Sequence, residues 1–135
     1  MIDSGLGGPG ASLRFWQHLS VLAADARLVI DRPRGTAHPR YPGFIYPLDY
    51  GYLEGTTAAD GGGIDAYLGS LRPAEVEGVI VTVDLLKRDA EIKILLGCTA
   101  EEMRSALATH DAAMQAATLL LRPVRGAPGG GSAVE

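Results

Sequence analysis

Two consecutive apolar runs in the second half of the chain restrict the fold more than any other feature. Residues 76–86 are rich in β-branched side chains and carry few charges, which is typical of a strand covered on both faces. Residues 91–96 then alternate with a period of two, so that Ile92, Ile94 and Leu96 share one apolar face. Two such neighbouring strands predict a sheet at the centre of the fold.

The elements around this strand pair predict an α+β fold. Residues 13–26 place apolar side chains on one helical face, and residues 27–31 have the pattern of a short strand. Thr99 and Glu102 form a capping-box pattern at the start of a second helix. That helix carries, at helical spacing, Met103, Leu107, His110 and Met114. Residues 118–121 are expected to add a final strand. Strands with a few helices outside, without βαβ alternation, favour a small, partly closed β-barrel with flanking helices.

The length and the distribution of glycine predict a single folded unit. A chain of 135 residues can bury one core without disulfides, and its single cysteine allows no internal disulfide. Residues 1–12 are glycine-rich and aperiodic, and residues 123–135 contain Pro-Gly-Gly-Gly-Ser, so both ends are expected to be flexible tails. The predicted domain is residues 13–122.

The charge balance argues against large anionic partners. Sixteen Asp and Glu against twelve Lys and Arg give a formal net charge of -4, which offers no basic surface for nucleic acid or an anionic membrane. No window approaches the roughly 18 apolar residues of a membrane span. The start of the chain lacks the basic and apolar segments of a signal peptide, so a cytoplasmic location is expected. Assembly into a homo-oligomer stays open.

Two segments carry acidic side chains in patterns that suit a metal ion. Asp60 and Asp65 flank three glycines, which let the backbone approach a ligand closely. Asp89, Glu91 and Lys93 occupy alternate positions of a strand and therefore share a face. Carboxylate oxygens are the ligands that Mg²⁺ prefers, and no Cys and His set indicates zinc. Each segment has an ordinary alternative: Asp60 can cap a hairpin turn, and a charged row can face solvent.

Phenol and cationic side chains supply candidate phosphate ligands. Tyr46, Tyr50 and Tyr52 lie in one short run, where Tyr52 suits a core position. The Tyr50 phenol can donate a hydrogen bond to a phosphate oxygen without adding charge. Lys93 and Arg40 can bind phosphate, the guanidinium as a fork and the ammonium as a point charge. Together with the acids, these side chains indicate a site for magnesium and a phosphate. His110, on the apolar helical face, is expected to be packed.

These segments resemble the soluble family I inorganic pyrophosphatases. Ile45-Tyr-Pro-Leu-Asp-Tyr-Gly-Tyr52 is similar to their Tyr-Pro-x-x-Tyr-Gly-Tyr pattern, and Asp60-Gly-Gly-Gly-Ile-Asp65 stands where they have Asp-Gly-Asp-Pro-x-Asp. Residues 30–35, Ile-Asp-Arg-Pro-Arg-Gly, resemble their Ile-Glu-Ile-Pro-x-Gly segment, and residues 40–41 stand in place of their Lys-Tyr. Residues 87–93 resemble a shortened Asp-x(4)-Asp-x-Lys segment. The likeness spans residues 29–96.

The resemblance implies a fold, a reaction and a set of roles. The fold would be a five-stranded OB-like barrel with helices outside. The reaction would be hydrolysis of pyrophosphate, or another small phosphoanhydride, with Mg²⁺ or, as an alternative ion, Mn²⁺. The implied catalytic residues are Tyr50, Asp65 and Lys93. The implied substrate-binding residues are Arg40, Tyr46, Tyr50 and Lys93. The implied metal ligands are Asp31, acting through water, with Asp60, Asp65, Asp89 and Glu91.

The chain departs from the family pattern at one position that matters for catalysis. The middle aspartate of Asp-Gly-Asp-Pro-x-Asp, which contacts the attacking water, corresponds to Gly62. Loss of a general base typically removes roughly 10² to 10⁴ in rate. The hairpin that carries a phosphate-binding arginine in the family is also missing, because only four residues separate Tyr41 from Tyr46. The alternative function is therefore a catalytically weak homologue that binds metal and a phosphate ligand as a regulatory protein.

Overall fold

The computed structural model describes residues 13–124, which form two helices and six strands. In chain order the elements are α1 (Leu13–Ala24), β1 (Arg27–Arg32), β2 (Asp49–Glu54), β3 (Ile64–Leu68), β4 (Val76–Asp84), β5 (Asp89–Leu96), α2 (Ala100–His110) and β6 (Gln115–Leu121). Neither helix of this part of the chain is long and apolar enough to cross a bilayer. The predicted tails, residues 1–12 and 123–135, lie outside the described residues except for 123 and 124.

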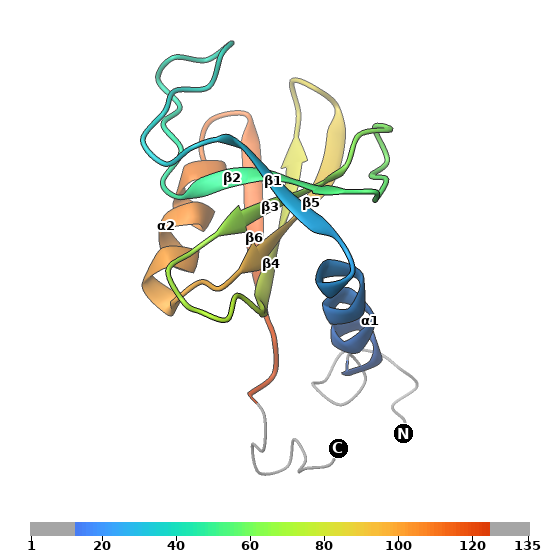
Figure 1. The fold of residues 1–135 in the computed structure, drawn as a ribbon. Coiled ribbons are helices and arrows are strands. Elements are labelled where there is room, and N and C mark those ends of the chain that lie inside the picture. The colour runs from blue at the N-terminus through green and yellow to red at the C-terminus, as the bar shows by residue number, and fades with distance from the viewer. Residues whose placement is uncertain (1–12, 125–135) are drawn as a thin grey trace, which may run out of the picture.

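The fold class is α+β, as predicted, but the barrel is wrong. The strands form one sheet in the order β1-β2-β3-β5-β4-β6, in which β3 and β5 run parallel and all other neighbours run antiparallel. Within residues 13–124 the sheet therefore has six strands instead of five. It is open, because β1 and β6 are its two edges and do not pair with each other. Figure 1 shows the resulting twisted sheet with α1 and α2 on opposite sides.

The predicted elements are present, with shifted ends. The first helix ends at Ala24, and β4 ends at Asp84 because its carboxylate turns the chain: Asp84 Oδ1 accepts hydrogen bonds from the backbone nitrogens of Leu86 and Lys87, both at 2.9 Å. The predicted capping box is confirmed, since the Thr99 side chain and the Glu102 side chain each bond the other's backbone nitrogen.

Helix α2 is shorter than its predicted apolar pattern, which extended to Met114. His110 is the last helical residue, and Met114 lies in the turn that leads to β6. The final strand consequently begins at Gln115 instead of residue 118. Strand β2 includes Tyr50 and Tyr52, and β3 begins directly after the three glycines. Neither strand was predicted, because the polar residues in these segments obscure the strand pattern.

The sheet buries a separate apolar cluster on each face. On one face Trp16 and Leu19 of α1 pack over strand residues that include Leu53, Val79 and Ile94. On the other face α2 covers a second set of buried side chains: Tyr46, Leu48, Tyr67, Ile80, Leu95, Cys98, Met103 and Ala106. Because successive strand residues point to opposite faces, Ile94 belongs to the α1 side and its neighbour Leu95 to the α2 side.

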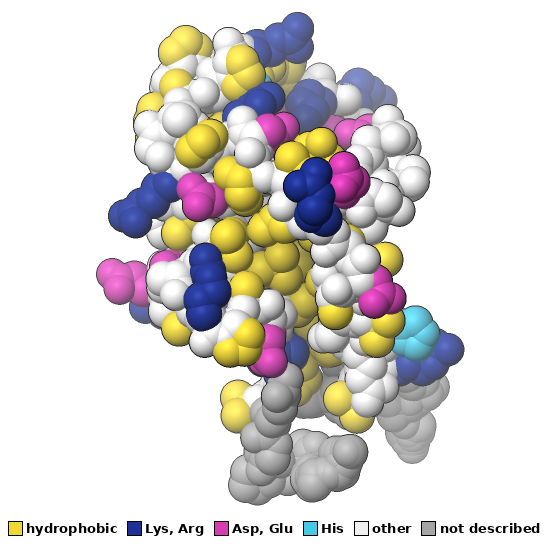
Figure 2. Space-filling view, viewed as in Figure 1, with side chains coloured by type: hydrophobic (Ala, Val, Ile, Leu, Met, Phe, Trp, Pro, Cys, Tyr) yellow, Lys and Arg dark blue, Asp and Glu magenta, His cyan; other side chains and the backbone are white. Residues whose placement is uncertain are grey.

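The contact between α1 and the sheet leaves an apolar hollow. Figure 2 shows hydrophobic side chains exposed in the groove beside α1. The groove has a volume of about 360 Å³ and is lined mainly by Ala23, Leu28, Leu53, Leu68 and Leu96. The α2 face of the sheet is different. Helix α2 covers only part of it, and the uncovered part carries charged and phenolic side chains.

Candidate functional site

Strand register brings three of the predicted site residues together. Tyr52 pairs with Asp65 across β2 and β3, and Asp65 pairs with Lys93 across the parallel strands β3 and β5. Tyr50 lies two positions before Tyr52 and so points to the same face. That face is the one that α2 covers farther along the strands, where Tyr67 and Leu95 are buried. Tyr50, Asp65 and Lys93 thus lie on the part of this face that α2 does not cover.

Gly51 separates the two tyrosines for a steric reason. Strand β2 crosses β1 so closely that a Cβ atom on Gly51 would collide with the carbonyl oxygen of Val29. Only a glycine fits at position 51, because any side chain there would collide with the backbone of β1. The Tyr-Gly-Tyr sequence lets β2 lie tightly on β1 while both phenols point to the opposite face of the sheet.

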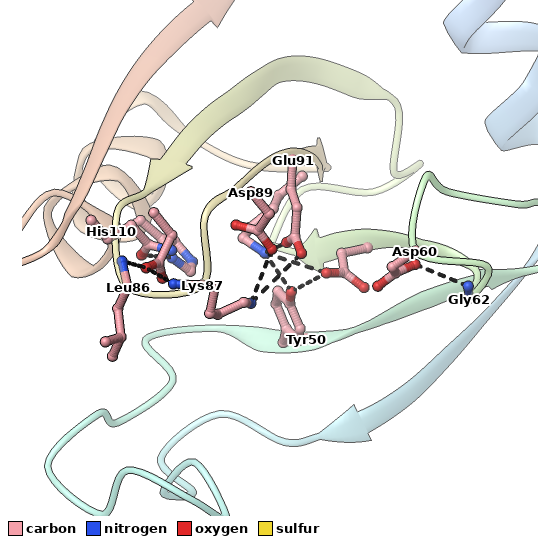
Figure 3. Close-up of polar contacts among 12 residues, drawn as sticks. Tyr50, Asp60, Gly62, Leu86, Lys87, Asp89, Glu91 and His110 are labelled. Atoms are coloured by element: carbon pink, nitrogen blue, oxygen red, sulfur yellow. Dashed lines mark hydrogen bonds and ion pairs between the residues drawn. The ribbon is translucent and has the colours of Figure 1, made fainter.

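Tyr50, Asp65, Glu91 and Lys93 form one hydrogen-bonded cluster, which we call the Lys93 cluster. Lys93 Nζ donates to Glu91 Oε1 at 3.0 Å, to Tyr50 Oη at 2.9 Å and to Asp65 Oδ2 at 3.3 Å. Tyr50 Oη in turn donates to Asp65 Oδ2 at 2.6 Å. All three ammonium protons thus have an acceptor. Figure 3 shows Tyr50 and Glu91 pointing toward one another from β2 and β5.

The surroundings fix the protonation states of the cluster. Burial alone would lower the pKa of Lys93, which is 5% exposed, but the carboxylates of Asp65 and Glu91 outweigh burial and raise it above its ordinary value. Burial raises the pKa of Tyr50 far above its ordinary value, and the Asp65 carboxylate raises it further. Burial opposes ionisation of Glu91, yet the Lys93 ammonium makes its pKa lower than usual. The cluster therefore holds a cation at Lys93, a neutral phenol at Tyr50 and an ionised carboxylate at Glu91 near neutral pH.

A second lysine extends the charged row along β5. Lys87, in the hairpin between β4 and β5, lies 3.6 Å from Asp89 Oδ2 and 3.7 Å from Glu91 Oε2. Half of the Lys87 side chain is exposed, so these contacts contribute little to stability. Figure 3 shows Lys87 reaching from the hairpin toward the two acids. The predicted common face of Asp89, Glu91 and Lys93 is confirmed, and it is an ion-paired face.

These side chains form one wall of an open pocket of about 880 Å³. Residues from β1, β2, β3, the β4–β5 hairpin, the turn after α2 and the long β1–β2 connection all contribute to its lining. Seven predicted site residues line it: Asp31, Tyr46, Tyr50, Asp60, Asp65, Glu91 and Lys93. Tyr52, expected in the core, is only half-buried and lines the pocket as well.

Two predicted site residues do not line the pocket, and two other cations do. Arg40 lies outside the lining, in the β1–β2 connection, and Asp89 faces Lys87 instead. Arg32 and Lys87, which sequence analysis did not select, are pocket residues. Arg32 could have been selected from the sequence because it directly follows the predicted site residue Asp31. Successive residues of a regular strand point to opposite faces, but an irregularity in the strand can turn two of them to the same side. Such an irregularity is present between residues 30 and 32.

Asp60 caps the glycine turn, which was the alternative to a role as a metal ligand. Its Oδ1 accepts a hydrogen bond from the Gly62 backbone nitrogen at 2.9 Å, as Figure 3 shows. The same aspartate lines the pocket that holds Asp65. The glycine turn therefore presents one exposed carboxylate to the pocket and uses that carboxylate to hold its own shape.

The oxygen donors suit magnesium, but they form no closed metal site. Among residues 13–124, no three Asp, Glu, His or Cys side chains are placed to hold one ion. Mg²⁺ is commonly bound by one or two carboxylates, with water and phosphate oxygens completing its shell. The pocket lining has five acidic side chains and three Lys or Arg, so an anionic ligand needs an added cation there. Asp60 and Asp65 are two of the carboxylates in this lining.

Next to the Lys93 cluster, His110 is buried in a hydrogen-bonded chain. Its Nδ1 lies 3.0 Å from Gln115 Oε1, which can only accept, so Nδ1 carries the proton. Its Nε2 then accepts the hydrogen bond of the Tyr67 hydroxyl at 2.7 Å. The predicted packing of His110 is confirmed, since the side chain is 4% exposed. Burial, assisted by the positive charge of Lys93, lowers the pKa of His110 to about 4.

We expect His110 to make the fold sensitive to acid. The unfolded chain binds a proton at His110 below about pH 6.5 and the folded chain only below about pH 4, so the free energy of unfolding falls as pH drops through this window. The loss approaches about 3 kcal/mol. Urea unfolding across that range should show a shallower pH dependence for His110→Gln than for the wild type. The matched control is His18→Gln, at an exposed position of α1, which should keep the wild-type dependence. Equal slopes in His110→Gln and the wild type would contradict the assignment.

Solved structures resemble the chain in fold at low sequence identity. No protein-family model matches the sequence, and no curated protein matches it. The inorganic pyrophosphatase from Neisseria gonorrhoeae has a TM-score of 0.56 and 18% identity, over 70% of this chain and 81% of that one. The enzyme from Thermus thermophilus has a TM-score of 0.55 and 17% identity over the same shares. The enzyme from Helicobacter pylori gives 0.53 and 12%, over 70% and 83%. At these identities the likeness shows a pyrophosphatase-like fold.

Proposed function

We propose that this protein hydrolyses inorganic pyrophosphate to two phosphates in a magnesium-dependent reaction. The observation that carries the proposal is the Lys93 cluster on the wall of a large pocket. A pyrophosphatase-like fold supports it, as does the sequence likeness of the tyrosine and aspartate segments. Cations, a neutral phenol donor and carboxylates meet at this pocket, and a diphosphate needs all three kinds of group.

Three cationic side chains would bind the diphosphate. Lys93, Lys87 and Arg32 all line the pocket. Because all three protons of Lys93 already have acceptors, a phosphate oxygen must replace one of them. Tyr50 stays protonated and can turn its hydroxyl from Asp65 to a phosphate oxygen. Binding thus exchanges internal hydrogen bonds for hydrogen bonds to the ligand.

Asp60 and Asp65 would hold the magnesium ion at the phosphate oxygens. When bound, magnesium neutralises phosphate charge and lowers the pKa of a coordinated water. In the reaction the oxygen of the attacking water bonds to one phosphorus as the bond from that phosphorus to the bridging oxygen breaks. The second phosphate leaves with the bridging oxygen. The carboxylates of Asp60 and Asp65 could take the proton from the water.

Lys93→Met should weaken diphosphate binding by about 10- to 100-fold, because a hydrogen bond to a charged group is worth about 1.5 to 3 kcal/mol. The measurement is calorimetric titration with imidodiphosphate, a non-hydrolysable analogue, in magnesium buffer. Lys93→Arg, which keeps the charge, should retain more affinity than Lys93→Met. Thermal unfolding of each variant establishes that it is folded. Wild-type affinity in folded Lys93→Met would place the phosphate site elsewhere.

A further inference from the structure

The pocket is larger than inorganic pyrophosphate requires and has a second, aromatic wall. Its volume of about 880 Å³ lies in the upper part of the range for pockets that enclose organic ligands of drug size, about 300 to 1,000 Å³. The Lys93 cluster occupies only the sheet side. A further part of the lining comes from the connection between β1 and β2, residues 33–48, which extends beyond the sheet in Figure 1.

The aromatic wall consists of His38, Tyr41, Phe44 and Tyr46 with Ile45 between them. The rings contact one another: His38 lies 5.0 Å from Tyr41, 5.9 Å from Phe44 and 6.3 Å from Tyr46 between ring centroids. Tyr46 continues the row to Tyr50 at 4.9 Å. A row of contacting rings therefore runs from Tyr41 through His38 and Tyr46 to Tyr50 of the Lys93 cluster.

Backbone hydrogen bonds hold this wall in shape. The His38 nitrogen donates to the Phe44 carbonyl at 2.8 Å, and the Phe44 nitrogen donates to the Tyr41 carbonyl at 2.9 Å. Ala37 and Ile45 form an isolated antiparallel bridge. The wall is thus a small hairpin with a fixed set of rings, and little ordering of this segment is needed when a ligand binds.

The aromatic wall is uncharged and partly exposed. His38 Nδ1 accepts hydrogen bonds from the backbone nitrogens of Arg40 and Tyr41, at 3.0 and 3.3 Å, so this nitrogen carries no proton. Burial and nearby cations lower the pKa of His38, which keeps the ring neutral. Tyr41 is 44% exposed and Ile45 is 49% exposed, although both line the pocket. Exposed apolar and aromatic surface beside a charged cluster suits a flat, uncharged group joined to a phosphate.

We propose that the pocket binds nucleoside diphosphates, with the diphosphate at the Lys93 cluster and the base stacked on Tyr41 and His38. This inference rests on the proposed function, since it uses the same phosphate site, and extends it to an organic phosphoanhydride. Stacking suits any base, because every base has an aromatic face. The exposed apolar side chains Leu86 and Met114 also line the pocket and offer further apolar surface to a nucleoside.

The test compares two non-hydrolysable probes, α,β-methylene-ADP and imidodiphosphate, by calorimetric titration in magnesium buffer. The wild type should bind α,β-methylene-ADP more tightly than imidodiphosphate. Tyr41→Ala should lower the affinity for α,β-methylene-ADP by about 5- to 100-fold, the effect typical of losing one stacked ring, and leave imidodiphosphate binding unchanged. Tyr41→Phe keeps the ring and should retain the affinity. Phe15→Ala, at a similarly exposed ring on α1, is the matched control and should change neither affinity.

The outcomes separate this inference from the proposed function. Binding of imidodiphosphate without binding of α,β-methylene-ADP would overturn the nucleotide inference and leave the pyrophosphate proposal standing. An equal loss of both affinities in Tyr41→Ala would also overturn it, because Tyr41 would then act on the phosphate site. If neither probe binds to the wild type, both proposals fail.

Discussion

Asp65→Asn should abolish magnesium-dependent hydrolysis while the protein stays folded. The change removes the negative charge that a magnesium ion would share between Asp65 and Asp60, and an amide oxygen is a far weaker ligand for a hard cation. It also removes an ionised acceptor of Tyr50 and Lys93. Lys93 keeps its ion pair with Glu91 at 3.0 Å, so the buried ammonium is still paired and the fold should persist.

The measurement for Asp65→Asn is phosphate release together with calorimetric titration of magnesium in the presence of imidodiphosphate. The matched control is Asp49→Asn on the same sheet, whose carboxylate accepts a hydrogen bond from the Arg34 nitrogen and does not line the pocket. Asp49→Asn should behave as the wild type. If Asp65→Asn kept its rate and its metal dependence, Asp65 would not be a metal ligand.

Gly62→Asp should raise the rate of pyrophosphate hydrolysis, by up to roughly 10² to 10⁴, the usual contribution of a general base. The structure accepts a side chain at this position. A Cβ atom on Gly62 would meet only Asp60 Oδ1, at an ordinary 3.5 Å, and its backbone φ lies outside the left-handed region. The new carboxylate would lie between Asp60 and Asp65 in sequence, where the pattern of the family I enzymes has its middle aspartate.

The neighbouring glycines show how specific this expectation is. Gly61 has a φ of +91°, which strains any other residue, and a Cβ on Gly63 would lie 2.8 Å from the Tyr52 ring and 2.9 Å from the Leu53 carbonyl oxygen. Of the three glycines only Gly62 combines room for a side chain with a backbone conformation that other residues adopt without strain. Gly62→Asn is the control for size without charge, and steady-state kinetics compares the two variants. No gain in Gly62→Asp, or an equal gain in Gly62→Asn, would mean that another group activates the water.

The strands that carry strong apolar patterns could be predicted, and the polar strands could not. Most of residues 76–83 and all of residues 93–96 are buried in the sheet, so the apolar composition of these segments indicates strands. Strands β2 and β3 carry Tyr, Gly and Asp on their pocket face, which obscures the alternation. The sheet stays open because β6 pairs with β4, and sequence period cannot predict which strands become edges.

The candidate site residues could be selected by residue type, but their positions in the sheet could not be predicted. Asp65 and Lys93 are adjacent because β3 and β5 pair in parallel with β4 outside them, a pairing that joins residues 28 positions apart. The missed cations Arg32 and Lys87 reach the pocket through a strand irregularity and a hairpin. The cytoplasmic location stays a prediction, and the oligomeric state stays open.

The most direct test of the proposed hydrolysis is phosphate release from pyrophosphate by the purified wild-type protein, measured with magnesium, with manganese and with EDTA. We predict turnover above the uncatalysed background with magnesium, and its loss with EDTA. Tight binding of imidodiphosphate without any phosphate release would support a binding protein in which Gly62 has cost the catalytic base. Phosphate release that EDTA leaves unchanged would contradict the metal-dependent mechanism itself.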